Sequence, residues 1–437
     1  MSFVRYPIYK DSGVEWLGEV PAHWRVVPLK HLAEFINGDA FKPTEWAETG
    51  IPIIRIQNLN GSDDFNYYGG EVEQRYLVHN GDLLFGWSGN RGTSFGPFLW
   101  SRSEVCALNQ HIFRVVPNST EKRLLFWTLK AVTAHVEDQA HGIIGMVHVT
   151  KGDLGAINVP VPPLPEQTQI AAFLDRETAK IDGLVAKQRR LMALLKEKRQ
   201  AVITHAVTRG LNPDTLMKPS GIEWLGDVPA HWGVTPLKYV VHLRSGGTPS
   251  KANLSYWNGD VPWASSKDLK VEALSDSQDH ITQSAVDDGA AELVPAGSLL
   301  IVVRGMILIH SFPVVKALVP MAINQDLKAL TPDAKLDVDF LAWLLRGSLR
   351  ETLGRIDEAA HGTKVLRLEA WTSMALPVPP LEEQLAIVSS IIDEMSKFDT
   401  LTAEAQRAID LLQERRTALI SAAVTGQIDV RSAVASA

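Results

Sequence analysis

Residues 13–30 read GVEWLGEVPAHWRVVPLK, and residues 221–238 read GIEWLGDVPAHWGVTPLK. Fourteen of these eighteen positions are identical, including both tryptophans and the Pro-Ala-His-Trp run. Self-similarity across roughly 200 residues is the sequence signature of a repeated structural unit. The stretch therefore predicts that one module occurs twice. We expect Trp16, Trp24, Trp224 and Trp232 to pack in the cores, since both copies carry them.

The repeat continues beyond this stretch. VPPLPEQTQIAAFL (161–174) matches VPPLEEQLAIVSSI (378–391), and LLKEKRQAVITHAVT (194–208) matches LLQERRTALISAAVT (411–425), each 217 residues further on. The predicted order is module, helix, module, helix. The predicted bounds are 1–160 for the first module, 161–212 for its helix, 213–377 for the second module, 378–429 for the second helix and 430–437 for a tail.

Both helical segments show start, stop and heptad signals. Each follows a Pro-Pro pair and ends near a glycine, Gly210 or Gly426. Steps of four and three residues from Ile170 and from Ile387 give the same hydrophobic register, which is typical of a coiled coil. Segment 161–212 has nine basic and five acidic residues (net +4), whereas 378–437 has five and nine (net −4). Connectivity then predicts an antiparallel pair with an approximate two-fold axis; the alternative is that each helix packs on its own module.

Polar residues interrupt the two predicted stripes at matching places. Glu177 and Lys198 do so in the first helix, and Glu394 and Arg415 in the second. In an antiparallel pair each acid would approach the base of the other helix, and such polar positions fix register. We therefore predict a polar seam made by these four residues.

Composition excludes several protein classes. The chain of 437 residues is 45% hydrophobic and 21% charged, enough for two or three domains. The single Cys106 excludes an intrachain disulfide framework and fits a reducing cytoplasm. The first residues, MSFVRYPIYKDSG, contain no secretory h-region. The longest apolar tract, from Ser298, is broken by Arg304, His310 and Lys316, so it predicts two short buried strands and no membrane span.

The modules read as mixed α+β. Short β-rich runs such as IPIIRIQNL, DLLFGW, HIFRVV and SLLIVV are bounded by Gly, Asn and Asp. Helical patterns, RLLFWTLKAV from Arg123 and FLAWLLRGSL from Phe340, stand at equivalent places late in each module. Apart from such landmarks the two modules diverge.

Catalytic and metal signatures are missing from the sequence. It contains no GxxxxGK[ST] phosphate loop, no GxGxxG after a strand, no HExxH and no Asn-Pro-Pro-aromatic motif. His23 and His231 lie inside the tryptophan-rich repeat, where packing is a better interpretation than metal ligation. We therefore predict neither catalytic residues nor a metal site in this chain.

Several of these motifs resemble those of a known protein family. GIEWLGDVPAHW, GGTPSKANLSYWNGDVPW (246–263), the LNQ and INQ triplets at 108–110 and 323–325, and both Pro-Pro-Leu-x-Glu-Gln helix starts are similar to those of DNA-specificity subunits of type I restriction-modification enzymes. The resemblance covers essentially the whole chain. It implies two target-recognition domains separated by two long antiparallel helices.

The resemblance also implies a function and partners. The chain would be non-catalytic and cytoplasmic, and each recognition domain would read one half of a bipartite asymmetric target in double-stranded DNA. The helices would hold two methyltransferase subunits, with restriction and translocase subunits joining the full complex. S-adenosylmethionine, ATP and Mg²⁺ would belong to those partners, and this chain would bind no cofactor. The net charge of −7 argues against binding by bulk positive charge alone.

Candidate base contacts combine amide, hydroxyl and cationic groups with nearby glycines, which allow the backbone to approach a groove. Ordinary polar turns remain the alternative for each of them. Asn109-Gln110 and Asn324-Gln325 recur in both modules, which favours scaffold hydrogen bonds over discrimination. The candidate DNA-binding residues are Arg55, Gln57, Asn58, Ser88, Asn90, Arg91, Ser265, Ser266, Lys267, Arg304 and Lys364.

Two other classes of function stay open on the sequence. A two-armed scaffold would grip proteins with its divergent modules and read no DNA. A nuclease hidden in one module would need a carboxylate cluster, for which the sequence gives no credible candidate.

Overall fold

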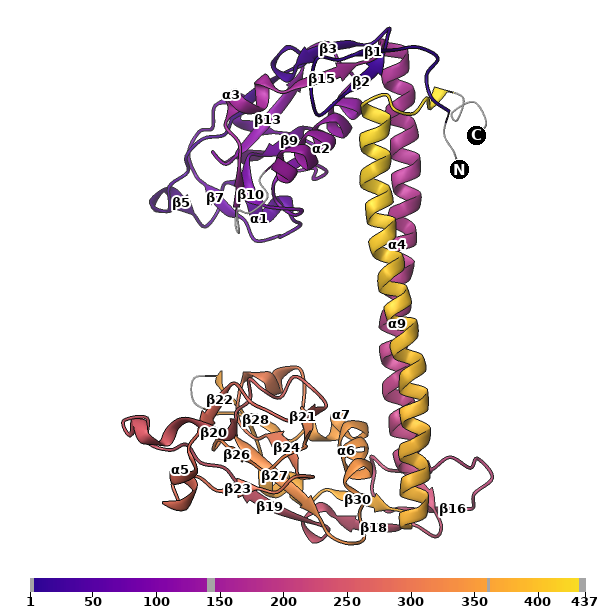
Figure 1. Cartoon of the computed structure of the whole chain (residues 1–437). Coiled ribbons are helices and arrows are strands. Elements are labelled where there is room, and N and C mark those ends of the chain that lie inside the picture. The colour runs from indigo at the N-terminus through magenta and orange to yellow at the C-terminus, as the bar shows by residue number, and fades with distance from the viewer. Residues whose placement is uncertain (1–3, 140–145, 360–361, 432–437) are drawn as a thin grey trace. The chain divides into compact units, whose positions relative to one another are not determined.

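The structure is a computed structural model that describes residues 4–139, 146–359 and 362–431. The chain forms two compact units, Met1–Arg189 with Gln406–Ala437, and Arg190–Ala405. We call these unit 1 and unit 2. Each contains one α/β module and parts of the two long helices, so the mixed α+β class and the internal repeat are confirmed (Figure 1).

The duplicated stretch folds the same way in both units. In unit 1, β1 (Tyr9–Asp11) pairs with β2 (Glu19–Pro21), and β3 (Arg25–Pro28) pairs with β15 (Asn158–Val161). In unit 2 the corresponding pairs are β16 (Met217–Pro219) with β17 (Asp227–Pro229), and β18 (Gly233–Pro236) with β30 (Ala375–Val378). The two-stranded ribbon β1–β2 covers Trp24 in unit 1, and the ribbon β16–β17 covers Trp232 in unit 2. Both indoles are buried.

Unit 1 stacks two sheets and a helix. Side chains of the central strand β9 point alternately to its two faces: Leu83 and Phe85 pack toward α2, whereas Leu84 packs toward the second sheet. The four-stranded sheet has the order β11-β9-β13-β4 and the five-stranded sheet the order β5-β7-β6-β12-β8. The bounds are β4 Ala33–Asn37, β5 Trp46–Ala47, β6 Ile51–Ile54, β7 Asn66–Tyr68, β8 Leu77–Val78, β9 Leu83–Gly86, β10 Ser88–Asn90, β11 Gly96–Leu99, β12 Cys106–Leu108, β13 Ile112–Pro117, β14 Met146–His148, α1 Ile56–Leu59, α2 Lys122–Gln139 and α3 Lys151–Ala156, with 3-10 turns η1 Leu29–His31, η2 Pro43–Glu45 and η3 Gln74–Tyr76.

Unit 2 repeats this plan with one addition. Its sheet β19-β27-β24-β25-β21 corresponds to β4-β13-β9-β11 plus a fifth strand, β21, which lies parallel to β25. The predicted pair of strands in the apolar tract from Ser298 is confirmed as β24 and β25. The bounds are β19 Val241–Ser245, β20 Trp257–Ala264, β21 Ala273–Leu274, β22 Asp279–Ile281, β23 Leu293–Val294, β24 Leu299–Val302, β25 Val314–Ala317, β26 Met321–Ile323, β27 Leu327–Pro332, β28 Ile356–Glu358, β29 Lys364–Leu366, α5 Gln283–Asp287, α6 Val338–Gly347, α7 Leu349–Leu353 and α8 Leu368–Thr372, with 3-10 turns η4 Leu237–Tyr239, η5 Leu254–Tyr256 and η6 Met306–Ile309.

The Glu-Gln pair at the start of each long helix joins that helix to its module. Glu166 accepts a hydrogen bond from the Tyr6 hydroxyl (2.5 Å) and contacts His23 Nε2 (2.9 Å). In unit 2, Glu383 contacts His231 Nε2 (2.8 Å) and accepts from the Trp232 indole (3.0 Å). The histidines of the repeat therefore have structural contacts, as predicted.

The glutamines of these pairs bind backbone on both sides. Gln167 accepts from the Glu121 amide (2.8 Å) and donates to the Pro162 carbonyl (2.9 Å). Gln384 accepts from the Asp337 amide (2.7 Å) and donates to two carbonyls, of Lys335 and Pro379. Asp337 in turn caps α6. Buried backbone groups are thus satisfied by one side chain in each unit.

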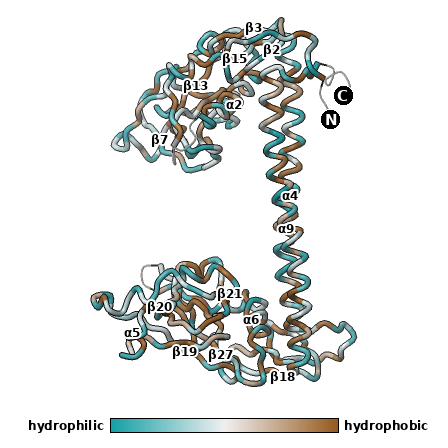
Figure 2. The backbone as a smooth tube through the Cα atoms, in the orientation of Figure 1, coloured by the Kyte–Doolittle hydropathy of each residue, from teal (hydrophilic) through white to brown (hydrophobic). Residues whose placement is uncertain are grey.

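The two long helices are α4 (Leu164–Arg209) and α9 (Leu381–Val424). Hydrophobic and hydrophilic residues alternate along both (Figure 2). In unit 1, Asp182 of α4 binds Arg416 of α9 at 2.9 Å; in unit 2, Arg199 of α4 binds Asp399 of α9. In unit 2, the end of α4 at Gly210 also adjoins Glu383, close to the start of α9. The segments of α4 and α9 in unit 2 therefore run antiparallel, as predicted.

The buried spacing along these helices differs from the predicted heptads. Ile387, Phe398, Ile409 and Ile420 are buried at intervals of eleven residues, whereas Leu184 and Leu401, which the heptads place in the stripe, are each 46% exposed. An eleven-residue repeat corresponds to about 3.67 residues per turn, close to a straight helix. The predicted heptads are therefore wrong at Leu184 and Leu401.

The same difference moves the polar seam by one residue. Lys198 and Glu394 line one cavity, as the seam prediction requires, but the described ion pairs of the two acids lie within their own helices: Glu177 bonds Lys180 (2.8 Å) and Glu394 bonds Lys397 (2.6 Å). Lys198 and Arg415 are exposed. Over the three heptads from 177 to 198, a helix of 3.6 residues per turn falls behind the 3.5 repeat by about 60°. The next residue, Arg199, and its counterpart Arg416 therefore face the other helix.

We expect these inter-helix ion pairs to contribute little to stability. Asp182 is more than half exposed, so solvent screens its attraction to Arg416. A double-mutant cycle with Asp182→Ala and Arg416→Ala should give a coupling below about 1 kcal/mol that falls as salt is added. The measurement is denaturant unfolding at two salt concentrations, with the Arg199–Asp399 cycle as the matched control. A salt-independent coupling well above this value would contradict the expectation.

Three remaining sequence predictions concern Cys106, membrane helices and the C-terminal tail. Cys106 lies in β12 with its side chain fully buried, and burial raises the pKa of its thiol to about 11. Among the residues that the structure describes, no helix combines the length and the apolar character needed to cross a bilayer. Of the predicted tail, 432–437 lies outside the described residues, whereas Val430 is buried and Arg431 binds Asp429 (2.6 Å).

Candidate nucleic-acid interface

The first group of predicted contacts lies in the turn after β6. Asn58 is only 3% exposed; its side-chain oxygen accepts from the Arg55 amide (2.9 Å), and its amide nitrogen donates to the carbonyls of Ser62 and Asp64 (3.0 Å each). Asn58 therefore holds the turn together. Gln57 is exposed but donates to the Asp64 carbonyl (3.0 Å), and the Arg55 guanidinium lies over the Trp46 ring.

The equivalent turn in unit 2 follows β20. Asp268 takes the place of Asn58 and accepts from the amide and hydroxyl of Ser265 (2.8 and 3.0 Å). Ser265 is buried, Ser266 is half-buried and Lys267 is exposed. Both units therefore share this turn as part of the scaffold. In unit 2, Ser266 and Lys267 are the predicted contacts whose side chains remain accessible there.

The second group lies where β9 leaves its sheet. Ser88–Asn90 forms β10, which pairs with β14 so that Ser88 stands opposite His148. The Asn90 carbonyl accepts from the amides of Thr93 and Ser94, which closes a tight loop around Arg91. Arg91 is exposed at this loop. The structure therefore brings Ser88, Asn90 and Arg91 together.

Three aromatic side chains that sequence analysis did not select adjoin this loop. The Trp87 ring lies 5.5 Å from His111 and 4.8 Å from His148, and its indole donates to the Gln110 carbonyl (2.9 Å). Both histidines are exposed. His111 directly precedes β13, and His148 is the last residue of β14. They are far apart in the sequence, so no local motif connects them. A flat ring with exposed imidazole donors suits stacking and hydrogen bonding to bases.

The equivalent place in unit 2 has the same backbone and other side chains. Leu366 donates to the Val303 carbonyl (2.9 Å), as Val149 donates to Trp87 (3.0 Å) in unit 1. Arg304 forms a bridge with Val365, and Gly305 donates to the Lys364 carbonyl (2.9 Å). The predicted residues Arg304 and Lys364 are therefore neighbours. The Lys364 ammonium binds Glu358 (2.6 Å), which lowers the pKa of that carboxyl.

The asparagines of the two Asn-Gln pairs behave as scaffold, as predicted from their recurrence, whereas Gln110 and Gln325 are exposed. Asn109 and Asn324 donate their amides to Ile54 and Ala264, equivalent carbonyls at the ends of β6 and β20. Their side-chain oxygens accept hydrogen bonds from the backbone amides of His111 (3.3 Å) and Asp326 (3.1 Å). One frame thus presents Trp87, His111 and His148 in unit 1, and Val303, Arg304 and Lys364 in unit 2.

Within residues 4–139, 146–359 and 362–431, no group of three or more His, Cys, Asp or Glu side chains could hold a metal ion.

A family match covers most of the chain. The family described as "Type I restriction modification DNA specificity domain" matches residues 21–190 and 229–411, one region for each copy of the repeat. The chain belongs to this family. The resemblance found in the sequence is confirmed, and so is the assignment to DNA-specificity proteins rather than to enzymes.

Curated relatives agree with the family. The specificity subunit of the EcoR124I/EcoR124II enzyme of Escherichia coli is 29% identical over 56% of this chain and 56% of its own length, so that match spans about half of each. The specificity subunit of the EcoBI enzyme of Escherichia coli is 23% identical over 96% of this chain and 89% of its own length.

Solved structures show the same fold. One, from a study of complex assembly and conformational transition of the type I restriction-modification system, has a TM-score of 0.68 at 17% identity, covering 93% of this chain and 98% of that chain. The HsdS subunit of Thermoanaerobacter tengcongensis has a TM-score of 0.50, also at 17% identity, covering 94% and 98%.

Proposed function

We propose that this chain is the DNA-recognition subunit of a type I restriction-modification complex and that each module reads one half of a bipartite asymmetric target. The proposal rests on one observation: the two modules share a backbone arrangement, but the side chains that this backbone presents are different. Base readout needs side chains specific to each sequence, whereas the backbone that positions them can stay the same. Trp87, His111, His148 and Arg91 would read one half; Arg304, Lys364 and Lys267 would read the other.

The remaining parts of the complex follow from the same proposal. The long helices would hold two methyltransferase subunits, and restriction and translocase subunits would join them. S-adenosylmethionine, ATP and Mg²⁺ would be bound by those partners and not by this chain. The net charge of −7 is consistent with partners that supply much of the phosphate contact. A buried, unreactive Cys106 suits a protein working in the reducing cytoplasm.

A module exchange tests independent reading. Replacing residues 1–160 by the corresponding module of a relative should change one half of the methylated target and leave the other half intact. The contacts at Gln167 and Glu166 preserve the frame in such a hybrid. Target sequences would be read by methylation of a randomised DNA library in the presence of the methyltransferase subunits. A folded hybrid in which both halves change together would contradict independent reading.

Single substitutions test the candidate contacts. We expect Arg91→Ala to weaken binding of the specific duplex by roughly 1–3 kcal/mol, with little effect on non-specific DNA. Arg75→Ala, an exposed arginine of the same module paired with Glu73, is the matched control. Salt-controlled titrations of the assembled complex on both duplexes give the comparison. Equal losses on both would make Arg91 a phosphate contact or a folding residue.

A protein-binding scaffold is the second candidate function. It predicts that the chain with its methyltransferase subunits retains a target duplex no better than those subunits alone. Retention only in the presence of this chain separates the two functions.

A further inference from the structure

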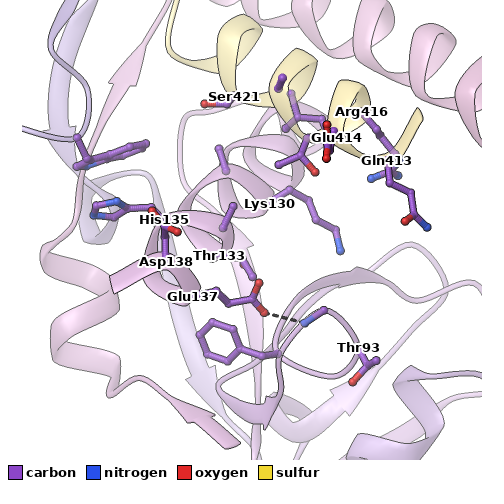
Figure 3. A pocket seen from close by; sticks show the side chains of 18 of the residues that line it. Thr93, Lys130, Thr133, His135, Glu137, Asp138, Gln413, Glu414, Arg416 and Ser421 are labelled. Carbon is purple, nitrogen blue, oxygen red and sulfur yellow. Dashed lines mark hydrogen bonds between the residues drawn. The ribbon is translucent and has the colours of Figure 1, made fainter. Parts of the chain in front are cut away.

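A cavity of about 910 Å³ opens in unit 1 between α2 and the last turns of α9 (Figure 3). Lys130 of α2 and Arg416 of α9 supply its cations. The Lys130 side chain points into the cavity, and its ammonium lies 5.3 Å from the Phe98 ring centre and 5.6 Å from that of Phe126. Two cations thus face a cavity that four acidic residues, Glu137, Asp138, Asp410 and Glu414, also line.

Lys130 lacks an anionic partner there. No hydrogen bond or ion pair joins its ammonium to another described residue, although Glu137 is near enough to act on its charge. Burial, together with the nearby charge of Arg416, outweighs the opposing effect of Glu137 and lowers the pKa of Lys130 to about 8. Arg416 itself binds Asp182. A partly buried ammonium without a counter-charge is costly, and an added carboxylate would offset that cost.

Unit 2 shows what such a partner looks like. Lys130 follows Trp127 by three residues, as Arg346 follows Trp343, and Arg416 corresponds to Arg199 at the repeat distance of 217. Between Arg346 and Arg199 lies the carboxylate of Glu272, 3.6 Å from the first guanidinium and 3.8 Å from the second. Glu272 therefore joins the two cations of unit 2, whereas in unit 1 no described carboxylate forms an ion pair with both Lys130 and Arg416.

Glu272 reaches this position on an extended segment. It precedes β21, the fifth strand of the unit 2 sheet, and Lys316 and Leu318 donate backbone hydrogen bonds to the carbonyls of Glu272 and Leu274 (3.0 and 2.8 Å). In unit 1 the sheet ends at β11, which has no such neighbour among the described strands. An open sheet edge accepts an additional strand by backbone pairing.

We infer that this cavity of unit 1 binds an extended acidic segment of a partner polypeptide, whose carboxylate lies between Lys130 and Arg416 while its backbone pairs with the edge of β11. Glu137, Asp138, Asp410 and Glu414 also line the cavity, so a nucleic-acid backbone with its repeated phosphates would be repelled. A single carboxylate that reaches the two cations meets less of that repulsion than a row of phosphates does. Unit 2 already supplies its own segment, so the two ends of the duplicated chain differ in what they can bind.

The test uses the full chain and the segment that the chain itself provides. A synthetic peptide of residues 268–278, DLKVEALSDSQ, would be titrated into protein with isotope-labelled lysine, and the Lys130 side-chain signal followed by NMR as a function of pH. We expect saturable binding in the millimolar range or tighter, with the pKa of Lys130 rising toward its ordinary value. The Glu272→Gln peptide should bind at least tenfold more weakly.

Two variants of the full chain separate the site from general charge effects. Lys130→Met should reduce binding of the peptide at least tenfold, whereas Lys122→Met, at an exposed lysine about two turns earlier in α2 that does not line the cavity, should leave it unchanged. The inference is overturned if about 10 mM peptide does not move the Lys130 signal, a limit near −3 kcal/mol on the affinity scale. It is also overturned if the Glu272→Gln peptide binds equally well, or if a short DNA duplex binds at Lys130 in preference to the peptide.

Discussion

Trp24→Ala should lower the free energy of unfolding of unit 1 by about 3–5 kcal/mol, the usual cost of removing a large buried side chain. Trp24 is 0% exposed and packs between the β1–β2 ribbon and the end of α9, where Gly426 leaves room for its ring. Trp232→Ala should cost a similar amount in unit 2. The substitution therefore tests whether the repeated stretch anchors each module.

Replacement by phenylalanine should distinguish the two tryptophans. The Trp24 indole nitrogen meets no acceptor among the described residues, whereas that of Trp232 donates to Glu383 (3.0 Å). Trp232→Phe should therefore cost about 1–3 kcal/mol more than Trp24→Phe. Denaturant unfolding combined with hydrogen exchange would follow each unit separately, because two units need not unfold together. Equal costs would show that the Trp232 hydrogen bond has no net effect on stability.

The second large effect is expected at Gln384. Gln384→Leu leaves the Asp337 amide and two carbonyls without their partner in a site that is fully buried, which should destabilise unit 2 by about 3 kcal/mol. Loss of the Asp337 contact should also loosen the cap of α6, visible as faster amide exchange in its first turn. Gln167→Leu should do the same in unit 1.

Gln406→Leu is the control for this pair, because Gln406 is exposed on α9 and bonds only Asp410 (2.8 Å). We expect a change within about 0.5 kcal/mol. A loss at Gln384 no larger than this control would mean that water replaces its hydrogen bonds and that the Glu-Gln motif has another role.

The repeat carried most of the fold that could be predicted from the sequence. Recurrence identified Trp24 and Trp232 as structural residues, whereas the contacts of Gln167 and Gln384 became visible only in the structure. The long helices were predictable because Pro-Pro starts and glycine ends are local signals. Their contact line was not, since a heptad and an eleven-residue repeat diverge only after several turns, which is why Arg199 and Arg416 replace the predicted Lys198 and Arg415.

The candidate interface was harder to predict for a different reason. Arg91 and Arg304 stand beside glycines in the sequence, and that local pattern selected them. Trp87, His111 and His148 come together only through the pairing of β10 with β14 and through sheet order, which the sequence does not state. Asn58 and Ser265 show the opposite error, because residues with base-like hydrogen-bonding groups also build tight turns. Only tertiary contacts decide which use applies.

The buried thiol of Cys106 makes the chain convenient for spectroscopy. With its pKa raised by burial, this sulfur reacts slowly with maleimides at neutral pH, and no other cysteine competes with an introduced one. Cysteines placed at exposed positions such as Lys267 or Thr93 would therefore take a fluorophore or spin label selectively, without first removing a native residue from the core. Each recognition module could then be watched separately as DNA and partner subunits arrive.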